Sequence, residues 1–542
     1  MDPSNEILGR LATIELSKNA HALLEMIKEI KPRQQGLIGE EYNVSQTVSF
    51  FGFIYEKLRN AVEFNDEHLI RRLAISRILR RRLQINPEGK GEGENVIREL
   101  LWGKYLPQQF FTQQDVLNIQ TIITKYVVLK REIYRIHVKT NRVMIHSLIV
   151  EMMSCEIEEM INWENTQRRS AYLYFFFQTL KDKILIKNTS DEMRDKLFYI
   201  ASERAYLKND DAFIKYHLFI LIFDRLINVD ENKLPIIAEQ FGMYTQTLAE
   251  ILKNRHIDLL VKFAKKQLPP FKILATILDK NLGHAEGIIT NEGELRKSVE
   301  ETCDEKYNET GTRLRNAAIR SITYIFLTKM IFVMILEFPL TRLIYGTIEV
   351  IPLIVNTLFP PLLMGIIVFF INPPSNDNTR KIYVRIIDIL NKDISFETEK
   401  VEIKQRFQMK KPSLLFTFSV LYLITFTVVF GSIFLFLDLL DYTILSKAVF
   451  LFFLCVVAFF GYRIRQTAKE YVVESKNNVI INLFAFLFLP ILYVGKFLSS
   501  QISRINIFII IFDSLIEAPF KFFIEVIEEW TRFIKARKDE LI

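Results

Sequence analysis

The sequence predicts an all-α fold, in which a large helical domain in the cytosol precedes a polytopic helical membrane domain. Continuous apolar runs occur only from about Ser321 onward. Before that point, apolar residues recur at three- and four-residue spacing, which is the period of amphipathic helices. Gly and Pro gather at a few breaks between these helix-length segments. Two regions with different solvents are therefore expected in one chain.

Composition supports a folded protein that faces lipid rather than nucleic acid. The chain has 542 residues, of which 50% are hydrophobic, and this excludes a disordered protein. The formal net charge of +7 is modest, and we interpret it as Lys and Arg near anionic lipid. The three cysteines are far apart and have no C-x-x-C spacing, so neither a disulfide framework nor a zinc site is predicted.

The region 1–318 is predicted to be the cytosolic helical domain. Its first residues, MDPSNEILGRLATIEL, are acidic and amphipathic and lack the basic and apolar parts of a secretory signal. A Gly- and Glu-rich stretch at 85–95 marks a sub-boundary. Long helices are expected within 115–163, followed by helices of roughly 15 to 20 residues in series, as in a solenoid-like or irregular bundle.

Capping-box spacing marks two helix starts in this domain, at Thr189 with Glu192 and at Asn291 with Glu294. From Glu292 a charged helix is expected to run into the first apolar stretch, with Gly311 as a candidate break. Such a helix would join the cytosolic domain to the membrane domain.

The region 319–527 is predicted to hold about six membrane spans in three hairpins. Crossing a hydrocarbon core of about 30 Å takes roughly 20 apolar residues, so four to six spans are acceptable. The first and last runs have a second interpretation, as buried core helices or re-entrant segments. The candidate spans are 321–338, 351–371, 413–437, 444–462, 479–498 and 505–518.

Basic residues predict the orientation of these spans. The segments 372–412, 463–477 and 528–542 carry nine, four and four Lys or Arg residues, whereas the alternate connections carry only Arg342, Lys447 and Arg504. Both termini and the loop 372–412 should therefore lie in the cytoplasm. The region 519–542 is predicted to be an amphipathic interfacial helix with a cytosolic tail. We expect an integral protein of the bacterial plasma membrane.

A basic amphipathic helix is predicted at 68–83, and its charges have three interpretations. It can lie on an anionic leaflet, bind nucleic acid, or display a solvated face while its apolar side joins the core; the last is favoured and nucleic acid is least favoured. The residues proposed for lipid contact are Arg71, Arg72, Arg77, Arg80, Arg81 and Arg82.

Ionisable residues inside the apolar runs are the candidate functional residues. A charge at a span centre costs roughly 2.5 to 3.5 kcal/mol and is seldom kept without a partner. Lys329 could pair with Asp513, and Glu337 with Lys521, which would hold the first and last spans together. Alternatively, the chain from Glu517 onward has already left the hydrocarbon.

No catalytic, nucleotide-binding or calcium-binding motif occurs in the sequence, and the seven histidines lack metal-ligand spacing. We therefore predict no cofactor and no metal. Enzymatic activity stays open, with a non-enzymatic protein favoured over a membrane enzyme that acts on lipid. The predicted function is a membrane anchor or scaffold that binds other proteins through its cytosolic helices. The alternative is a transporter or channel, in which Lys329, Glu337, Asp513 and Glu517 line a polar path.

Overall fold

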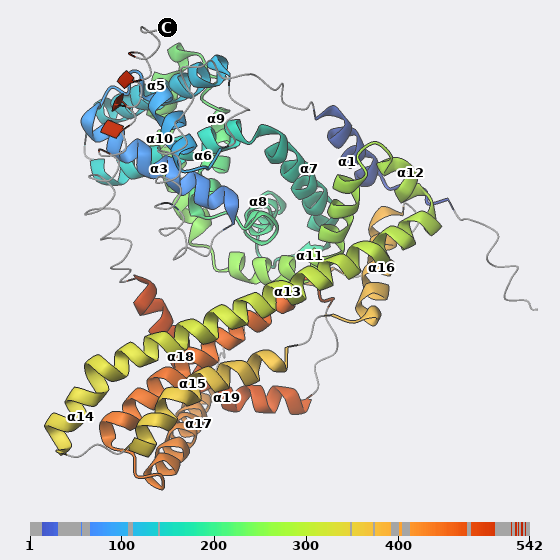
Figure 1. The fold of residues 1–542 in the computed structure, drawn as a ribbon. Coiled ribbons are helices and arrows are strands. Elements are labelled where there is room, and N and C mark those ends of the chain that lie inside the picture. Colours follow the sequence, from blue (N-terminus) through green and yellow to red (C-terminus); the bar gives the residue numbers. More distant parts are fainter. Residues whose placement is uncertain are drawn as a thin grey trace, which may run out of the picture. The chain divides into compact units, whose positions relative to one another are not determined.

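A computed structural model describes most of the chain, and the described part is almost entirely helical, with 84% helix and 2% strand. The helical fold class predicted from the sequence is confirmed at this level. Figure 1 shows the course of the chain. The described residues are 13–30, 56, 66–106, 112–138, 141–346, 350–371, 374–391, 400–403, 412–473 and 479–504, with eight further positions between 522 and 537.

The described chain divides into two compact units. Unit 1 comprises residues 1–20, 266–398 and 404–506, and unit 2 comprises residues 21–265, 399–403 and 507–542. The predicted boundary at 318 marks where the chain would enter a bilayer, and this remains a prediction, as does the sub-boundary at 85–95. The two units are described separately below.

Unit 2 is a stack of helices with one short parallel strand pair, in which β1 (Ile184–Leu185) pairs with β2 (Val401–Glu402). Two further short elements are η4 (Lys181–Lys183) and η6 (Glu231–Lys233), and η5 (Glu203–Leu207) is a π-helix. The α-helices of this unit, with α1 and α11 reaching across its limits, are α1 (Lys18–Glu29), α3 (Glu67–Ile85), α4 (Glu92–Trp102), α5 (Gln113–Ile136), α6 (Arg142–Ile161), α7 (Trp163–Leu180), α8 (Asp191–Ser202), α9 (Asp211–Phe223), α10 (Leu234–Leu252) and α11 (His256–Lys280).

Side-chain caps define where several of these helices begin. Thr112 and Asp115 form a complete capping box at the start of α5, and Asp210 accepts hydrogen bonds from two backbone amides at the start of α9. The cap of α8 is Ser190, whose hydroxyl accepts a hydrogen bond from the amide of Met193. The sequence predicted Thr189 at this position, so the cap lies one residue further along. Each cap satisfies amides that the first helical turn leaves unpaired.

The core of unit 2 forms where α3, α5, α6, α9 and α10 pack on one another. Large aromatic side chains fill it, including Tyr126, Tyr216 and Tyr244, which are almost completely buried. Buried hydroxyl groups usually have hydrogen-bond partners, although that of Tyr216 has none among the described residues. Tyr126 donates to Glu156 at 2.9 Å, and Tyr244 donates to the carbonyl of Lys215 at 2.7 Å.

Unit 1 contains the apolar helices. Its helix α13 is 41 residues long and continues through Gly311, the candidate break. Asn291 caps this helix by accepting hydrogen bonds from the amides of Gly293 and Glu294, as its position predicted. The elements are α12 (Ala285–Thr290), α13 (Glu292–Phe332), the π-helix η7 (Val333–Glu337), α14 (Phe338–Tyr345), α15 (Val350–Phe369), α16 (Asn376–Leu390), α17 (Pro412–Asp438), α18 (Ile444–Ala468) and α19 (Val479–Arg504).

Four helical segments among the described residues are long and apolar enough to cross a membrane: Glu292–Ile344, Pro352–Phe369, Phe416–Asp438 and Ile444–Gln466. They coincide with the first four predicted spans. The fifth predicted span lies in α19, where the segment Phe486–Ser499 is apolar but shorter. The sixth, 505–518, lies outside the described residues. A span count above four therefore remains a prediction.

Close approach of helix backbones organises these apolar helices. Ile325, Met364 and Val457 form a small core between α13, α15 and α18. Gly495 on α19 faces α18 so closely that a Cβ atom there would lie 2.1 Å from the carbonyl oxygen of Cys455. Small residues at such crossings are typical of helix packing in membranes, because close contact replaces the hydrophobic driving force.

Candidate functional site

In unit 2, a mostly buried histidine is held between two buried carboxylates. His217 on α9 places its Nδ1 atom 2.8 Å from both oxygens of Glu203, and its Nε2 atom 2.7 Å from Oε1 of Glu159. Glu203 lies on the π-helix η5 and Glu159 on α6. Because both ring nitrogens face acceptors, both must carry a proton, and the imidazole is positively charged.

The charge of His217 is stabilised against its burial. Burial alone would lower the pKa of His217, but the negative charges of Glu203 and Glu159 outweigh burial and raise that pKa to about 10. Arg225 also binds Glu159, at 2.9 Å, and it stacks over the ring of Trp163 at 5.2 Å. His217 is therefore a fixed cation near neutral pH. A general acid–base catalyst would instead need a pKa close to the working pH.

A small cavity lies beside His217, and the centre of a water molecule can occupy about 20 Å³ of it. One buried water needs about 10 to 15 Å³ by the same measure, so the cavity has room for a single water molecule. Oε1 of Glu158 has no hydrogen-bond partner among the described residues. The cavity is lined by His68, Glu158, Glu159, Asn162, Thr166, Arg169, Ser170, Leu207, Asn209, Phe213 and His217.

Two groups on this cavity have pKa values far from the ordinary ones. Burial raises the pKa of Glu158 to about 7, although the charge of Arg71 opposes this. Burial and the charge of Arg169 lower the pKa of His68 to about 3, so His68 is neutral. Its Nε2 atom lies 3.3 Å from Oδ1 of Asn209. The Nδ2 atom of Asn209 in turn donates to Glu203. The cavity therefore joins a continuous hydrogen-bonded network.

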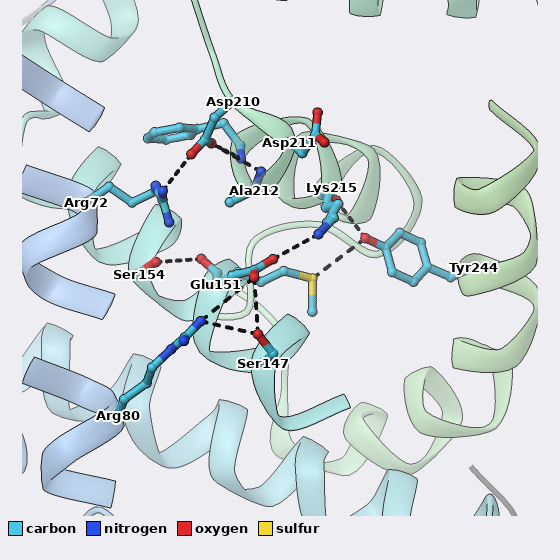
Figure 2. A network of polar contacts seen from close by, with 12 residues as sticks. Arg72, Arg80, Ser147, Glu151, Ser154, Asp210, Asp211, Ala212, Lys215 and Tyr244 are labelled. Atoms are coloured by element: carbon cyan, nitrogen blue, oxygen red, sulfur yellow. Dashed lines mark hydrogen bonds and ion pairs between the residues drawn. The ribbon is translucent and has the colours of Figure 1, made fainter. Parts of the chain in front are cut away.

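A second network links α3, α6 and α9 (Figure 2). Glu151 lies between Lys215, whose Nζ atom is 2.9 Å away, and Ser147, whose hydroxyl donates to it at 3.2 Å. Arg80 reaches the same place and donates to Ser147 at 3.2 Å. These contacts link three helices through charged side chains that are partly exposed.

The six arginines of the predicted basic helix lie on α3, and the structure shows a polar partner for each. Arg71 binds Glu158 at 2.7 Å, and Arg72 binds Asp210 at 2.6 Å. The partner of Arg77 is Glu56, at 2.9 Å, and Glu99 binds both Arg81 and Arg82. Only the side chain of Arg80 is as much as half exposed, at 49%. Carboxylates therefore compensate five of the six arginines inside the domain. Lipid contact by the six arginines stays a prediction.

The apolar helices of unit 1 contain a buried polar cluster. Nζ of Lys329 lies 3.0 Å from Oε2 of Glu337, and Nδ2 of Asn356 donates to Oε1 of the same carboxylate at 2.6 Å. All three residues are completely buried. The ammonium group of Lys329 also lies 4.7 Å from the centre of the Phe453 ring, which is a favourable cation–π distance.

The π-helix η7 brings Lys329 and Glu337 together. Residues eight apart in an α-helix point about 80° away from each other. A π turn inserts one residue, so the pair behaves like residues seven apart, which share one face. The irregular turn over Val333–Glu337 therefore makes a charge pair within one helix that a regular helix would separate.

Three hydroxyl or amide atoms near Glu337 have no hydrogen-bond partner in the described part of the chain: Oγ1 of Thr341, Oδ1 of Asn356 and the hydroxyl of Tyr442. Thr341 lies one helical turn after Glu337. Burial and the charge of Glu337 raise the pKa of Tyr442 to about 12. The cluster thus has spare hydrogen-bonding capacity beside a compensated charge pair.

The sequence analysis identified part of these sites. Lys329 and Glu337 were predicted to pair with Asp513 and Lys521, which lie outside the described residues, as does Glu517. In the described part of the chain, Lys329 and Glu337 contact each other. Pairing with Asp513 or Lys521 remains a prediction. Asn356 and His217 were not among the residues predicted from the sequence, although each is a polar residue within an apolar helical run.

Among the described residues there is no group of three His, Cys, Asp or Glu side chains that could hold a metal ion. The chain matches no known protein-family model, no curated protein sequence and no solved structure. The geometry of the two units is therefore the basis for any functional assignment.

Proposed function

We propose that the chain is an integral membrane anchor whose helical unit 2 presents a binding surface to other proteins. The observation that carries the membrane part is the exposure of α17. Leu423, Val428 and Leu435 on this helix are each about 60% exposed, and aromatic residues on it are exposed as well. Patches of this kind on a helix mark an interaction with lipid or another protein.

The free-energy cost of exposing apolar side chains to water favours a bilayer as their cover. Moving one large apolar side chain out of water stabilises by about 1.5 to 3 kcal/mol. Exposed apolar residues also occur on α13, α15 and α18, for example Ile331, Leu362 and Ile444. Several neighbouring helices with outward apolar faces fit a hydrocarbon solvent better than one local partner.

The scaffold part rests on the state of the buried charges in unit 2. His217 is held as a cation by two carboxylates, and Arg71 and Arg72 are paired with acidic residues of other helices. These charges hold helices together, which suits a rigid binding platform. We further propose location in the bacterial plasma membrane with both termini in the cytoplasm, supported by the distribution of basic residues. Nucleic acid is the least favoured partner.

One observation favours transport as a second candidate function. The Lys329–Glu337–Asn356 cluster lies at a π turn in an apolar helix and keeps unpartnered polar atoms beside it. Irregular helices with charged residues often mark ion or substrate paths. In the scaffold proposal, by contrast, the same three residues only stabilise the packing of the helices and bind no ion or substrate.

Substitution at Glu337 separates these two functions. Glu337→Gln leaves the buried ammonium of Lys329 without its anion, which is expected to cost about 3 to 5 kcal/mol. A scaffold predicts lower thermal stability in detergent, partial recovery when Lys329→Met is added, and no solute or ion flux in liposomes for any variant. Asp441→Asn, in an exposed connection, is the matched control.

Specific flux in the wild type that Glu337→Gln removes without loss of stability would overturn the scaffold proposal in favour of transport. Extraction of the wild-type protein from liposomes by alkaline carbonate would contradict the membrane anchor itself. Both measurements use the full chain, so the two parts of the proposal can fail independently.

A further inference from the structure

The connection between α5 and α6 combines exposed apolar side chains with basic ones. Ile136 at the end of α5 and Val138 after it are 39% and 71% exposed, and Val143 and Met144 in the first turn of α6 are 79% and 52% exposed. The two helix ends are close together, because the hydroxyl of Tyr134 donates to the carbonyl of Arg142 at 3.0 Å. We call these four apolar residues, with Arg131, Arg135 and Arg142, the α5–α6 patch.

The charge on and around the patch is positive. The sequence has no Asp or Glu between Glu132 and Glu151. Arg131, Arg135 and Arg142 are exposed. Arg135 binds Glu132 at 2.6 Å and remains 69% exposed, while the guanidinium of Arg142 stacks over Tyr134 at 5.5 Å.

Charges from neighbouring elements extend this positive region. Burial lowers the pKa of His146, and the charges of Lys130 and Arg80 lower it further. Arg80 is the half-exposed arginine of α3, and it approaches α6 through Ser147 (Figure 2). Glu151 and Lys215 compensate each other one turn beyond this point. Glu88 is an acidic neighbour that acts on Arg131. The hairpin segment 131–146 still has a net positive charge, because it carries four Lys or Arg residues and one Glu.

We propose that the α5–α6 patch docks on the anionic lipid of a membrane surface, with its apolar side chains inserted among the headgroups and its arginines on the phosphates. This inference rests on the membrane anchor proposed above. Basic residues close to an anionic leaflet each strengthen binding by about fivefold. Apolar side chains beside them add affinity in proportion to the area that leaves water.

A lipid surface fits the patch better than an acidic protein segment does. Because unit 2 belongs to an anchored chain, lipid is present at high effective concentration, and weak intrinsic affinity is enough for docking. The residues of this patch differ from the six arginines of α3 that the sequence suggested for lipid contact. Five of the six arginines of α3 have carboxylate partners at 3.0 Å or less, whereas Arg131 and Arg142 lie on the exposed side of the hairpin.

A lipid-quenching experiment on the full chain tests the proposal. Val143→Cys is labelled with an environment-sensitive fluorophore and reconstituted into phosphatidylcholine liposomes with or without phosphatidylglycerol, with spin-labelled lipid as quencher. Labelling is selective because Cys155, Cys303 and Cys455 are buried. Leu117→Cys is the control, because Leu117 is exposed and lies about 28 Å along α5 from Ile136 in the patch.

Docking predicts strong quenching at position 143 only in liposomes with phosphatidylglycerol, loss of quenching at high salt, and little quenching at position 117. Combined Arg135→Glu and Arg142→Glu should lower the ratio of docked to free hairpin by at least about 25-fold. Equal quenching with and without anionic lipid, or no quenching at position 143, would overturn the proposal.

Two further outcomes identify what failed. If the labelled protein does not integrate into liposomes, the anchor proposal fails, and the docking proposal fails with it. The protein can also integrate while the fluorescence at position 143 changes with protein concentration and not with the lipid. The patch would then contact another copy of the chain, and the lipid proposal would be wrong. The anchor proposal would then remain intact.

Discussion

The positive charge of His217 stabilises unit 2, because its two ring N–H groups donate to the buried carboxylates of Glu203 and Glu159. The pKa of this histidine is about 10 in the folded protein and near 6.5 in an unfolded chain. A raised pKa means that the stabilisation is fully present below about pH 6.5. It is lost as pH rises through about 10. The charge of this one imidazole therefore makes the stability of unit 2 depend on pH in the alkaline range.

We expect the stability of unit 2 to fall between pH 7 and pH 9.5, by up to about 1.4 kcal/mol per pH unit. His217→Gln should lower stability at pH 7 by about 3 to 5 kcal/mol, because Glu159 and Glu203 lose their shared cation. The same substitution should also make the stability of unit 2 fall less steeply as the pH rises. Hydrogen exchange of the α9 amides in the full chain measures both effects, since it reports local opening free energies.

The control for this prediction is His284→Gln, because His284 is exposed and lies in unit 1. It should change neither the stability of α9 nor the pH dependence. An unchanged alkaline slope in the His217→Gln variant would show that the imidazolium does not stabilise the fold.

At the scale of elements, helix ends and helix crossings determine local stability. The start of α8 depends on the hydroxyl of Ser190, which accepts a hydrogen bond from the amide of Met193 at 3.3 Å. The π turn of η7 and the close contact at Gly495 decide how the apolar helices of unit 1 face one another. The cap at Ser190 and the close contact at Gly495 can each be tested by a single substitution with a matched control.

Ser190→Ala should destabilise unit 2 by about 0.5 to 2 kcal/mol, because the first turn of α8 loses its side-chain cap. Thr189→Ala removes the adjacent hydroxyl, which is not the cap, and should change stability by less than about 0.5 kcal/mol. Hydrogen exchange of the first α8 amides distinguishes the two variants. Equal protection in both would contradict the assigned cap.

Gly495→Ala should force α18 and α19 apart, because the new Cβ atom would meet the backbone of Cys455. Overpacking of this kind typically costs about 1 to 3 kcal/mol. Gly431→Ala on α17 is the matched control, since nothing lies within 4 Å of a Cβ there. Thermal unfolding in detergent should show a lower midpoint for Gly495→Ala only, and an equal midpoint for both would refute the close crossing.

At the scale of the whole molecule, the distribution of charge sets the expected orientation in a membrane. Seventeen Lys and Arg residues lie in the proposed inner segments after the first span and three in the outer connections. An asymmetry of this size normally determines which side of a membrane a loop faces. The connection between α17 and α18 should therefore face outward and the start of α16 inward.

Cysteine labelling of intact cells tests this orientation. Asp441→Cys should react with an impermeant thiol reagent, and Asn376→Cys should react only after the membrane is permeabilised. Both positions are exposed, so a lack of reaction reports the membrane and not burial. The opposite labelling pattern would reverse the proposed topology.

The sequence by itself determined the helical class and the positions of four long apolar helices, because both follow from local periodicity and from continuous apolar length. It also identified Lys329 and Glu337, since charges in apolar runs are visible without a fold. Only the tertiary structure decided their partners. The contact of His217 with Glu159 joins residues 58 apart, and the arginines of α3 meet carboxylates from several other segments. Such pairings depend on which helix faces meet, and helix packing is not encoded in local spacing.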